Sequence, residues 1–520
     1  MIRRYTASAD NTIVSAYQLN LKTRGTGANA GRADILETFS IYGRQSTSSQ
    51  ELSRILVKFP VAKISADRTA GKVPASGSVN FYLKLYNAPS SKTVPRNYKL
   101  LVKAISRDWE EGDGLDLEGY KDLTYSKYGS NWIRASEAAS WTSVGGDYRN
   151  KPDRTQQFLE GPENLEINVT KFVEDWIDGS GGGGYTNYGF GIRMSASYEA
   201  SSSAAAVRID SNVILNPDGA IKSYYTKRFF GRGSQYFFFR PAIEARWNST
   251  KTDDRGHFFF SSSRAPASEN LNTLYFYNMV RGKLVNLPGI GTAGKLVVSL
   301  FSGSKDNTVP SGSGAASTPL TLDGSKIFAT ASWVSTGIYS CDLCLLSSSV
   351  KTVYDVWFSG SDSIGNPRKA TQYFTGSLQP MVIAGGESTA VPLYYLAMTN
   401  LQPKYLKNDT PRLNLFVRKK NWSPTIYTVS TAKVESETII SASYRVYRIL
   451  DGFPAIPFGT GSDYHTGLSY DVSGNYFDLD MKLLEPGYAY GLKFAFYDER
   501  NEAWNEQEET FKFRVEDYEY

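Results

Sequence analysis

The sequence feature that most constrains the fold is a strict alternation of large apolar residues with polar or small residues in short segments. It is clearest in residues 477–483, 490–496 and 511–515, where every second side chain is a large apolar one. A period of two puts alternate side chains on opposite faces of a β-strand, so each segment is expected to bury one face. In residues 54–59, the apolar side chains of 55, 57 and 59 are expected on one face and the polar Arg54 and Lys58 on the outer one, where Leu56 interrupts the alternation and indicates partial cover. The pattern predicts an all-β protein.

Composition supports this prediction and sets the size of the protein. The chain has 520 residues, enough for about three or four domains. It contains 35 Tyr, 27 Phe and 45 Gly, a balance that favours twisted antiparallel sheets with glycine-rich turns over helices. Only two cysteines are present, so a disulfide framework is excluded, which fits synthesis and assembly in a reducing cytoplasm.

Charge and hydropathy exclude several classes of function. There are 57 Lys and Arg against 52 Asp and Glu, and no basic block of the kind that follows a nucleic-acid backbone. No stretch of about 18 apolar residues occurs. The two arginines near the start are not followed by an apolar run, so no secretory signal is expected. Nucleic-acid binding and a membrane span are therefore not expected.

Residues 165–194 change their hydrophobic period twice. The first residues alternate as a strand, and Thr170 is then well placed as a helix N-cap. The apolar side chains of 172–177 share one helical face. Gly179 and the glycine run at 181–184 end this short helix, because glycine adopts the left-handed cap conformation without steric cost. Alternation resumes afterwards, so the unit is predicted to be strand, helix, glycine loop and strand.

An ordered set of motifs in residues 1–245 carries a resemblance to a known family. The motifs are ADNTIV, RILVKFP, VNFYLKLY, DWEEGDG, SWTSVGGD and LEINVTKFVEDWIDG followed by NYGFGI. Together they resemble the DNRLRE-type module, similar to carbohydrate-binding jelly rolls of secreted polysaccharide-degrading enzymes, cell-wall proteins and phage virion proteins. The residues that form this structural signature are Trp109, Gly112, Trp176, Asn187, Gly189 and Phe190. The resemblance implies an N-terminal jelly-roll β-sandwich.

Two departures from the family pattern bear on function. The polar insertion at about 20–50 is long, and no export signal precedes the first predicted strand at 9–14. The missing signal favours a virion protein that is assembled in the host cytoplasm and released by lysis. Later phrases of the chain, such as EARWNSTKTDDRG and TVYDVWFSG, resemble structural proteins of tailed phages, particularly marine ones.

The second half of the chain is expected to form two smaller β-sandwich domains. Residues 246–395 combine an extended entry segment with short strands between Gly/Ser turns, and residues 396–520 are predicted to be an Ig-like or fibronectin-like sandwich. The junction before them, 222–247, is rich in aromatic residues and arginine. Phe237–Phe239 are interpreted as a strand buried on both faces, at a domain junction or a subunit contact.

Aromatic residues near predicted loops are the candidate ligand-binding residues. Exposed aromatic rings stack on sugar rings, and the candidates for a glycan site are Tyr185, Tyr188, Trp132 and Trp141. Trp109 and Trp176 each end an apolar pattern and are expected in the core. The alternative for the four candidates is that they pack the sandwich or a neighbouring subunit.

No cofactor is expected, although one acidic loop has the residue types that calcium prefers. Carboxylates crowd this loop at Glu110, Glu111, Asp113 and Asp116. Such hard oxygen ligands suit Ca²⁺, but a solvated turn has the same composition. Asp478 and Asp480 are expected on the outer face of a strand as solubilising groups. No carboxylate pair has the aromatic surroundings of a glycosidase site.

Neither the cysteines nor the histidines form a recognisable catalytic or metal-binding pattern. Cys341 and Cys344 have the C-x-x-C spacing, but residues three apart on a strand point to opposite faces. We therefore expect one core thiol and one incidental thiol. His257 and His465 are the only histidines, and each is expected in a surface loop or at a strand edge.

The sequence predicts a non-enzymatic structural component of a tailed phage virion, located in the tail, baseplate, neck or capsid surface. Its expected partners are other virion proteins and copies of itself. The alternative is a glycan-binding adhesin that attaches to host-surface polysaccharide. A polysaccharide-degrading enzyme has the least support.

Overall fold

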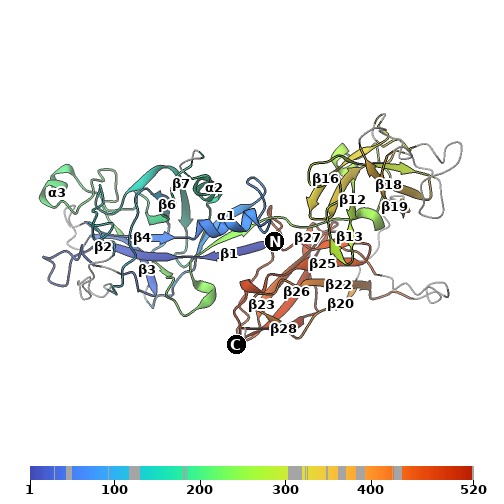
Figure 1. Cartoon of the computed structure of the whole chain (residues 1–520). Helices are drawn as coiled ribbons and strands as arrows, with labels where there is room; N and C mark the ends of the chain where they lie inside the picture. Colours follow the sequence, from blue (N-terminus) through green and yellow to red (C-terminus); the bar gives the residue numbers. More distant parts are fainter. Residues whose placement is uncertain are drawn as a thin grey trace.

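The computed structural model describes residues 1–520 except 29, 43–49, 92, 116–128, 180–181, 183, 303–318, 323, 325, 347–349, 361–369, 382–392, 424–425, 427–435 and 518–520. Strands account for 42% of the described residues and helices for 9%, so the protein is all-β, as the alternation predicts. We call the parts that contain β1–β11, β12–β19 and β20–β28 the N-terminal, middle and C-terminal modules. Figure 1 shows an elongated molecule with the N-terminal module at one end and the other two modules at the opposite end.

The N-terminal module is built from two antiparallel sheets. The first has the strand order β1 (Ile2–Thr6), β11 (Ala242–Arg246), β5 (Asn80–Leu85) and β8 (Leu165–Asn168). The second has the order β10 (Tyr224–Phe230), β3 (Ile35–Tyr42), β4 (Gln50–Lys58), β9 (Phe190–Met194), β6 (Tyr98–Ile105) and β7 (Tyr148–Phe158), with β2 (Ala9–Ser15) paired to β4. Apolar side chains of both sheets and of helices α1 (Val61–Thr69) and α2 (Thr170–Asp178) share one core. The predicted strand at 9–14 is β2, and β1 precedes it.

Residues 165–194 form the predicted strand, helix, glycine loop and strand as β8, α2 and β9. The side chains of α2 predicted to face the core are buried at Phe172, Val173 and Trp176. Gly179 ends the helix with a φ of +63°. The prediction that Thr170 is the N-cap is wrong, because Val169 occupies the cap position without a side-chain hydrogen bond. The Thr170 hydroxyl instead accepts a hydrogen bond from the backbone N–H of Phe81, which ties the helix start to β5.

The signature residues of the glycine loop hold it against β4. Asn187 Nδ2 donates to a carbonyl just after β4 at 2.8 Å, and its Oδ1 accepts from the N–H of Gly189 at 3.0 Å. Gly189 has a φ of +87°, and a Cβ atom there would lie 2.3 Å from the carbonyl oxygen of Val57. Only glycine fits this close approach. Phe190 then packs on Trp176 with ring centroids 4.7 Å apart.

The outer face of the second sheet is covered and forms a small core of its own. Its buried residues include Ile13, Leu52, Leu56, Trp109, Trp132 and Trp141. The covered outer face that Leu56 indicated is therefore confirmed. Arg54 was expected on a polar outer face, and this prediction is wrong: the segment that carries the three tryptophans lies over β4, so Arg54 is buried.

The middle module is one curled sheet of six strands. Their order is β12 (Asn272–Tyr277), β17 (Ile338–Leu343), β16 (Ala329–Ser335), β15 (Leu296–Phe301), β18 (Val353–Ser359) and β19 (Gln372–Leu378). A short hairpin, β13 (Met279–Val280) and β14 (Lys283–Leu284), follows β12. Tyr339, Cys341 and Trp357 lie in the core of this module.

The C-terminal module contains two sheets with a shared core. One has the order β20 (Tyr394–Met398), β22 (Arg412–Lys419), β25 (Gly474–Asp478) and β24 (Ser469–Asp471). The other has the order β21 (Lys404–Leu406), β28 (Phe511–Glu516), β26 (Ala489–Asp498) and β23 (Ala442–Arg448), with β27 (Ala503–Glu506) paired to β26. The segments predicted at 490–496 and 511–515 lie in β26 and β28.

Two segments predicted as strands are 3₁₀ turns. β25 ends at Asp478, and residues Met481–Leu483 form the turn η6. Asp480 was expected to be solubilising, but it is buried and its Oδ1 accepts from the N–H of Lys482 at 3.1 Å, so it caps the turn. Phe237–Phe239 form the turn η2 instead of a strand. A run of three phenylalanines can fill a junction between modules either from a strand or from a turn, so the sequence alone did not distinguish the two.

The N-terminal module joins the C-terminal module through packed side chains. Phe238 stacks on Phe453 with ring centroids 5.0 Å apart, and both Phe238 and Ile2 belong to the C-terminal core. Arg3 lies 3.7 Å from Asp480. The predicted position of Phe237–Phe239 at a domain junction is thus confirmed.

The middle module joins the C-terminal module through Tyr470 of β24. The hydroxyl of Tyr470 donates to Asp254 Oδ1 at 2.7 Å, and its backbone N–H donates to the carbonyl of Lys251 at 3.0 Å. The N–H of Asp253 donates to the carbonyl of Tyr470 at 3.1 Å. Residues 251–254, which lead into the middle module, therefore run alongside β24 of the C-terminal module.

Candidate functional site

Two of the four predicted glycan-binding residues are buried. Trp132 is 0% exposed and Trp141 is 6% exposed. The indole of Trp132 donates to the carbonyl of Asn212 at 3.0 Å, and the indole of Trp141 donates to the carbonyl of Asn131 at 2.8 Å. Stacking on a sugar requires an open ring face, so the prediction is wrong for both residues. They serve the outer core, as do Trp109 there and Trp176 in the main core, which were predicted to be core residues.

The two predicted tyrosines are half-buried, and other side chains of the protein contact the ring of each and the hydroxyl of Tyr185. The hydroxyl of Tyr185 donates to Asp175 Oδ2 at 2.8 Å, and the Arg149 guanidinium lies 3.9 Å from the centre of its ring. Burial and the hydrogen bond to Asp175 raise the pKa of Tyr185 to about 12. The ring of Tyr188 has Lys58 Nζ at 5.9 Å. A cation thus lies over each of the two rings that would face a sugar.

The carboxylates of the predicted calcium loop have separate internal partners. Glu110 Oε2 accepts from the N–H groups of Gly129 and Glu137 at 3.3 and 3.0 Å. Glu111 forms a two-pronged ion pair with Arg232, with distances of 2.8–3.1 Å. The signature residue Gly112 has a φ of +77° and turns the chain directly after Glu111. Asp113, which follows this turn, is exposed. Asp116 lies outside the described residues. In the parts of the chain that the structure describes, no three acidic, cysteine or histidine side chains gather where they would hold a metal ion.

The thiols and imidazoles are more buried than the sequence indicates. Cys341 is in the middle core, where burial raises the pKa of its thiol. Cys344 was expected to be incidental, but it is buried as well, with Sγ 3.4 Å from the carbonyl of Leu322. His465 was expected in a surface loop, and this prediction is wrong, because it is buried beside the N-terminal module; burial lowers its pKa to about 4. His257 is half-buried.

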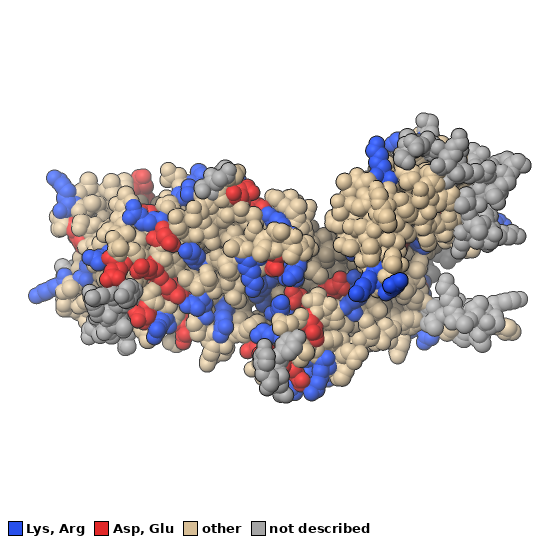
Figure 2. Space-filling model, viewed as in Figure 1, with Lys and Arg blue, Asp and Glu red and all other residues tan. Residues whose placement is uncertain are grey.

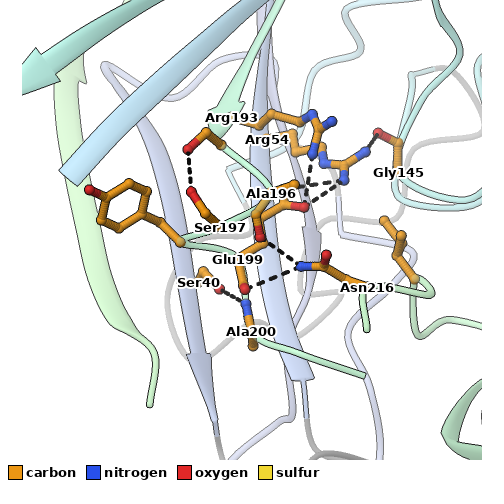
Figure 3. A network of polar contacts seen from close by, with 12 residues as sticks. Ser40, Arg54, Gly145, Arg193, Ala196, Ser197, Glu199, Ala200 and Asn216 are labelled. Carbon is orange, nitrogen blue, oxygen red and sulfur yellow. Dashed lines mark hydrogen bonds and ion pairs between the residues drawn. The ribbon is translucent and has the colours of Figure 1, made fainter. Parts of the chain in front are cut away.

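A buried polar network underlies the loops at the free end of the N-terminal module (Figure 3). Glu199 accepts hydrogen bonds from Arg54 Nη2 at 3.2 and 3.3 Å and from Arg193 Nη1 at 2.8 Å. Arg54 Nη1 also donates to the carbonyl of Gly145 at 2.9 Å. Because one carboxylate pairs with two guanidinium groups away from water, loss of Glu199 would leave two cations without their shared partner. The network fixes the segment after β9 to the second sheet.

Further hydrogen bonds fasten the same segment at both ends. Asn216 Nδ2 donates to the carbonyls of Ala196 and Glu199 at 2.9 and 3.2 Å, as Figure 3 shows. The N–H of Ala200 donates to Ser40 Oγ at 2.8 Å. The chain between these points therefore leaves the sheet and returns to it at fixed positions.

We call residues 17–24 and 203–222 the distal tip. Its helix α3 (Ala204–Ile209) lies at the end of the molecule farthest from the other two modules (Figure 1). Arg24 joins the two loops, since its Nε lies 2.5 Å from Asp210 Oδ2. Five large aliphatic side chains of the tip are between 48% and 84% exposed. They are Leu19, Leu21, Ile209, Leu215 and Ile221.

A hollow that we call the junction pocket lies where the N-terminal module meets the C-terminal one. It has a volume of about 290 Å³. Side chains from both modules line it, among them Gln235, Tyr236, Phe237, Arg448, Glu485 and Tyr488. Residues 235–237 come from η2 and the turn before it, whereas the other three come from the end of β23 and the loop before β26.

The sequence contains one pattern that indicates the exposed aliphatic residues of the distal tip. In the segment RIDSNVILNPDGAIK, aliphatic residues stand among Asp, Asn, Pro and Gly with no period that would bury them. The aromatic run of the junction pocket was recognised as a junction. Its polar partners Arg448 and Glu485 were missed because only the folded chain brings them to it.

Comparison of the chain with protein-family models gives no match, and no curated protein matches it. Among solved structures, the adhesin InvE of Yersinia pseudotuberculosis is similar at 13% sequence identity with a TM-score of 0.14. The matched region covers 49% of this chain and 61% of that one. At this TM-score the similarity carries no conclusion about fold or function. Within the described residues, no helix combines the length and hydropathy that crossing a bilayer requires.

Proposed function

We propose that the protein is a non-enzymatic structural component of a tailed phage particle that acts through assembly contacts. The observation that supports this best is the distal tip. Five aliphatic side chains stand exposed on hydrogen-bonded loops at the far end of an elongated body. Several large exposed apolar groups on two loops that Arg24 joins are typical of a protein interaction site.

The anchoring of the tip favours binding to a partner of fixed shape. Ordering a flexible loop on binding costs free energy, and a loop that is already held avoids this cost. Arg24 and the Glu199 network hold the two loops before any partner arrives. Asn20 Oδ1 also accepts from the N–H groups of Lys22 and Thr23 at 2.9 and 3.0 Å, which fixes the turn that carries Leu19 and Leu21.

Surface charge agrees with an assembly role. Figure 2 shows Lys, Arg, Asp and Glu interspersed over the visible face of the N-terminal module, without a single-sign field of the kind nucleic acid requires. At the tip, exposed Lys22, Arg208 and Lys222 accompany the aliphatic side chains, with Asp218 as an exposed acid. The fitting partner is a protein surface with an apolar centre and an acidic rim.

The assignment to a tailed phage rests on the motif resemblance. The proposed location is the tail, baseplate, neck or capsid surface of the particle. Mass spectrometry of purified particles tests it, because the protein must be present in them at a fixed copy number. An Ile209→Asp/Leu19→Asp variant should be incorporated at least tenfold less. Leu159→Asp is the matched control, since Leu159 is a 62% exposed aliphatic residue elsewhere on the same module. A protein absent from particles, or equal loss for both variants, would overturn the proposal.

A glycan-binding adhesin is the second candidate, and the aromatic lining of the junction pocket favours it. A polysaccharide-degrading activity has the least support. Glu110 and Glu111, which the sequence places side by side, accept hydrogen bonds from backbone N–H groups and from Arg232 within the fold.

A further inference from the structure

The junction pocket combines half-open aromatic rings with a fixed charged group. Tyr236 is 50% exposed, and its ring packs edge-on or tilted against Phe230 and Phe239 at 5.5 and 5.6 Å. Phe237 and Tyr488, on opposite modules, are half-buried in the same hollow. The aromatic surface is therefore preformed, and part of it stays open to solvent.

Arg448 is held in one position at the edge of this surface. Its Nε and Nη2 donate to Asp451 at 3.0 and 2.6 Å, and its Nη1 donates to Glu485 Oε2 at 2.6 Å. The guanidinium carbon lies 4.8 Å from the centre of the Tyr488 ring and 5.2 Å from that of Phe238. Two carboxylates thus face one cation, so this group of charges has a net charge of −1.

Hydrogen-bonding groups of the pocket keep capacity for a ligand. Glu485 uses Oε2 for Arg448, and the second carboxylate oxygen accepts from no donor in the described residues. Gln235 is exposed at the rim. The volume of about 290 Å³ is just below the range of roughly 300–1,000 Å³ typical of drug-sized ligand sites, which suits a single sugar ring.

We propose that the junction pocket binds a neutral sugar ring of a glycan. A pyranose presents a face of C–H groups that stacks on an aromatic ring and a rim of hydroxyls that bonds to carboxylate and amide groups. Tyr236 supplies the open ring, since Arg448 already lies over the ring of Tyr488, and Glu485 and Gln235 supply the polar groups. The net negative charge around Arg448 excludes uronic and sialic acids, because their carboxylate would meet two acids whose one cation is already paired. This site is independent of the assembly contacts at the distal tip.

Saturation-transfer NMR on the full chain tests the site, with glucose, galactose, mannose, N-acetylglucosamine and glucuronic acid as probes. At least one neutral sugar should receive saturation, and glucuronic acid should receive none. Tyr236→Ala should reduce the affinity for that sugar at least tenfold. Gln235→Ala, which changes only an exposed rim residue, should weaken it severalfold. The matched control is Tyr224→Ala, since Tyr224 is 62% exposed on the same module and its ring also packs on a neighbouring ring.

The proposal is overturned if no neutral sugar binds, if glucuronic acid binds as well as the neutral sugars, or if Tyr224→Ala and Tyr236→Ala have equal effects. These outcomes are separate from those at the tip. A chain that binds sugar but is absent from particles contradicts the assembly role alone. A chain found in particles that binds no sugar contradicts only the pocket.

Discussion

Replacing Glu244 by glutamine is expected to destabilise the pairing of β1 with β11 in the first sheet. Glu244 on β11 is 1% exposed, with Arg4 nitrogens at 2.8 and 3.0 Å and Arg246 nitrogens at 2.6 and 3.1 Å. Lys84 Nζ lies 4.0 Å away. Burial raises the pKa of Glu244, but the three cations outweigh burial and hold that pKa far below its ordinary value. The carboxylate is thus charged at neutral pH and compensates three cations.

The free-energy cost of Glu244→Gln follows from the charges that remain in the folded chain. Glutamine keeps the shape of the side chain but removes the carboxylate that pairs with Arg4, while Lys84 and Arg246 keep Glu166, a 40% exposed carboxylate. Removing one partner of a buried ion pair costs about 3–5 kcal/mol. Since each 1.4 kcal/mol is a tenfold change in an equilibrium constant, local opening of the β1–β11 pair should increase by more than ~100-fold.

Hydrogen exchange of the β1 and β11 amides at pH 7, followed by mass spectrometry, measures this opening. Glu166→Gln is the matched control, because Glu166 lies 2.6 Å from the same Arg246 but is partly solvated, so its loss should cost less than about 1 kcal/mol. Exchange in Glu244→Gln that stays within a fewfold of the wild type, or that equals the control, would refute the reasoning.

The same residue predicts a pH dependence. Because the pKa of Glu244 is lower in the folded chain, its contribution is complete above the ordinary glutamate pKa of about 4.3 and is lost as pH falls through the folded value. Wild-type protection of β11 should therefore decline in acid, and Glu244→Gln should show a smaller decline.

Three further outcomes are expected. Burial lowers the pKa of His465 to about 4, so stability should fall as pH drops from about 6.5 towards 4, and His465→Gln should lose this dependence in thermal unfolding curves. Burial raises the pKa of Asp10 to about 7, so stability is lost as pH rises through 7; Asp10→Asn should resist urea better by on the order of 2 kcal/mol at pH 8 and gain nothing at pH 4. Glu199→Gln leaves Arg54 and Arg193 without the carboxylate that they share, which should cost about 3–5 kcal/mol and expose the distal tip to trypsin; unchanged cleavage would contradict the anchoring role.

Local periodicity was enough to predict most elements of the fold. The alternation at 490–496 and 511–515 is that of β26 and β28, and the change of period in 165–194 marks the helix α2. These predictions succeed because the spacing of apolar residues within a strand or a short amphipathic helix identifies its buried face. The resemblance to a DNRLRE-type module stays a prediction.

Contacts between distant segments could not be predicted in the same way. Period two assigned Arg54 to an outer face, but it does not reveal that the segment of Trp132 and Trp141 covers that face. The same limit applies to both interaction surfaces. Arg448 reaches Phe238 only through the junction of two modules. Ile209 ends helix α3 in the distal tip and is 79% exposed, which local periodicity does not reveal.

The most direct test of the assembly role is an electron cryomicroscopy reconstruction of the phage particle with this protein carrying a fused label. We predict label density at a fixed, symmetry-related position, with the distal tip in contact with a neighbouring virion protein. The account is contradicted if the label is absent from the particle, or if the protein is present with its distal tip facing solvent.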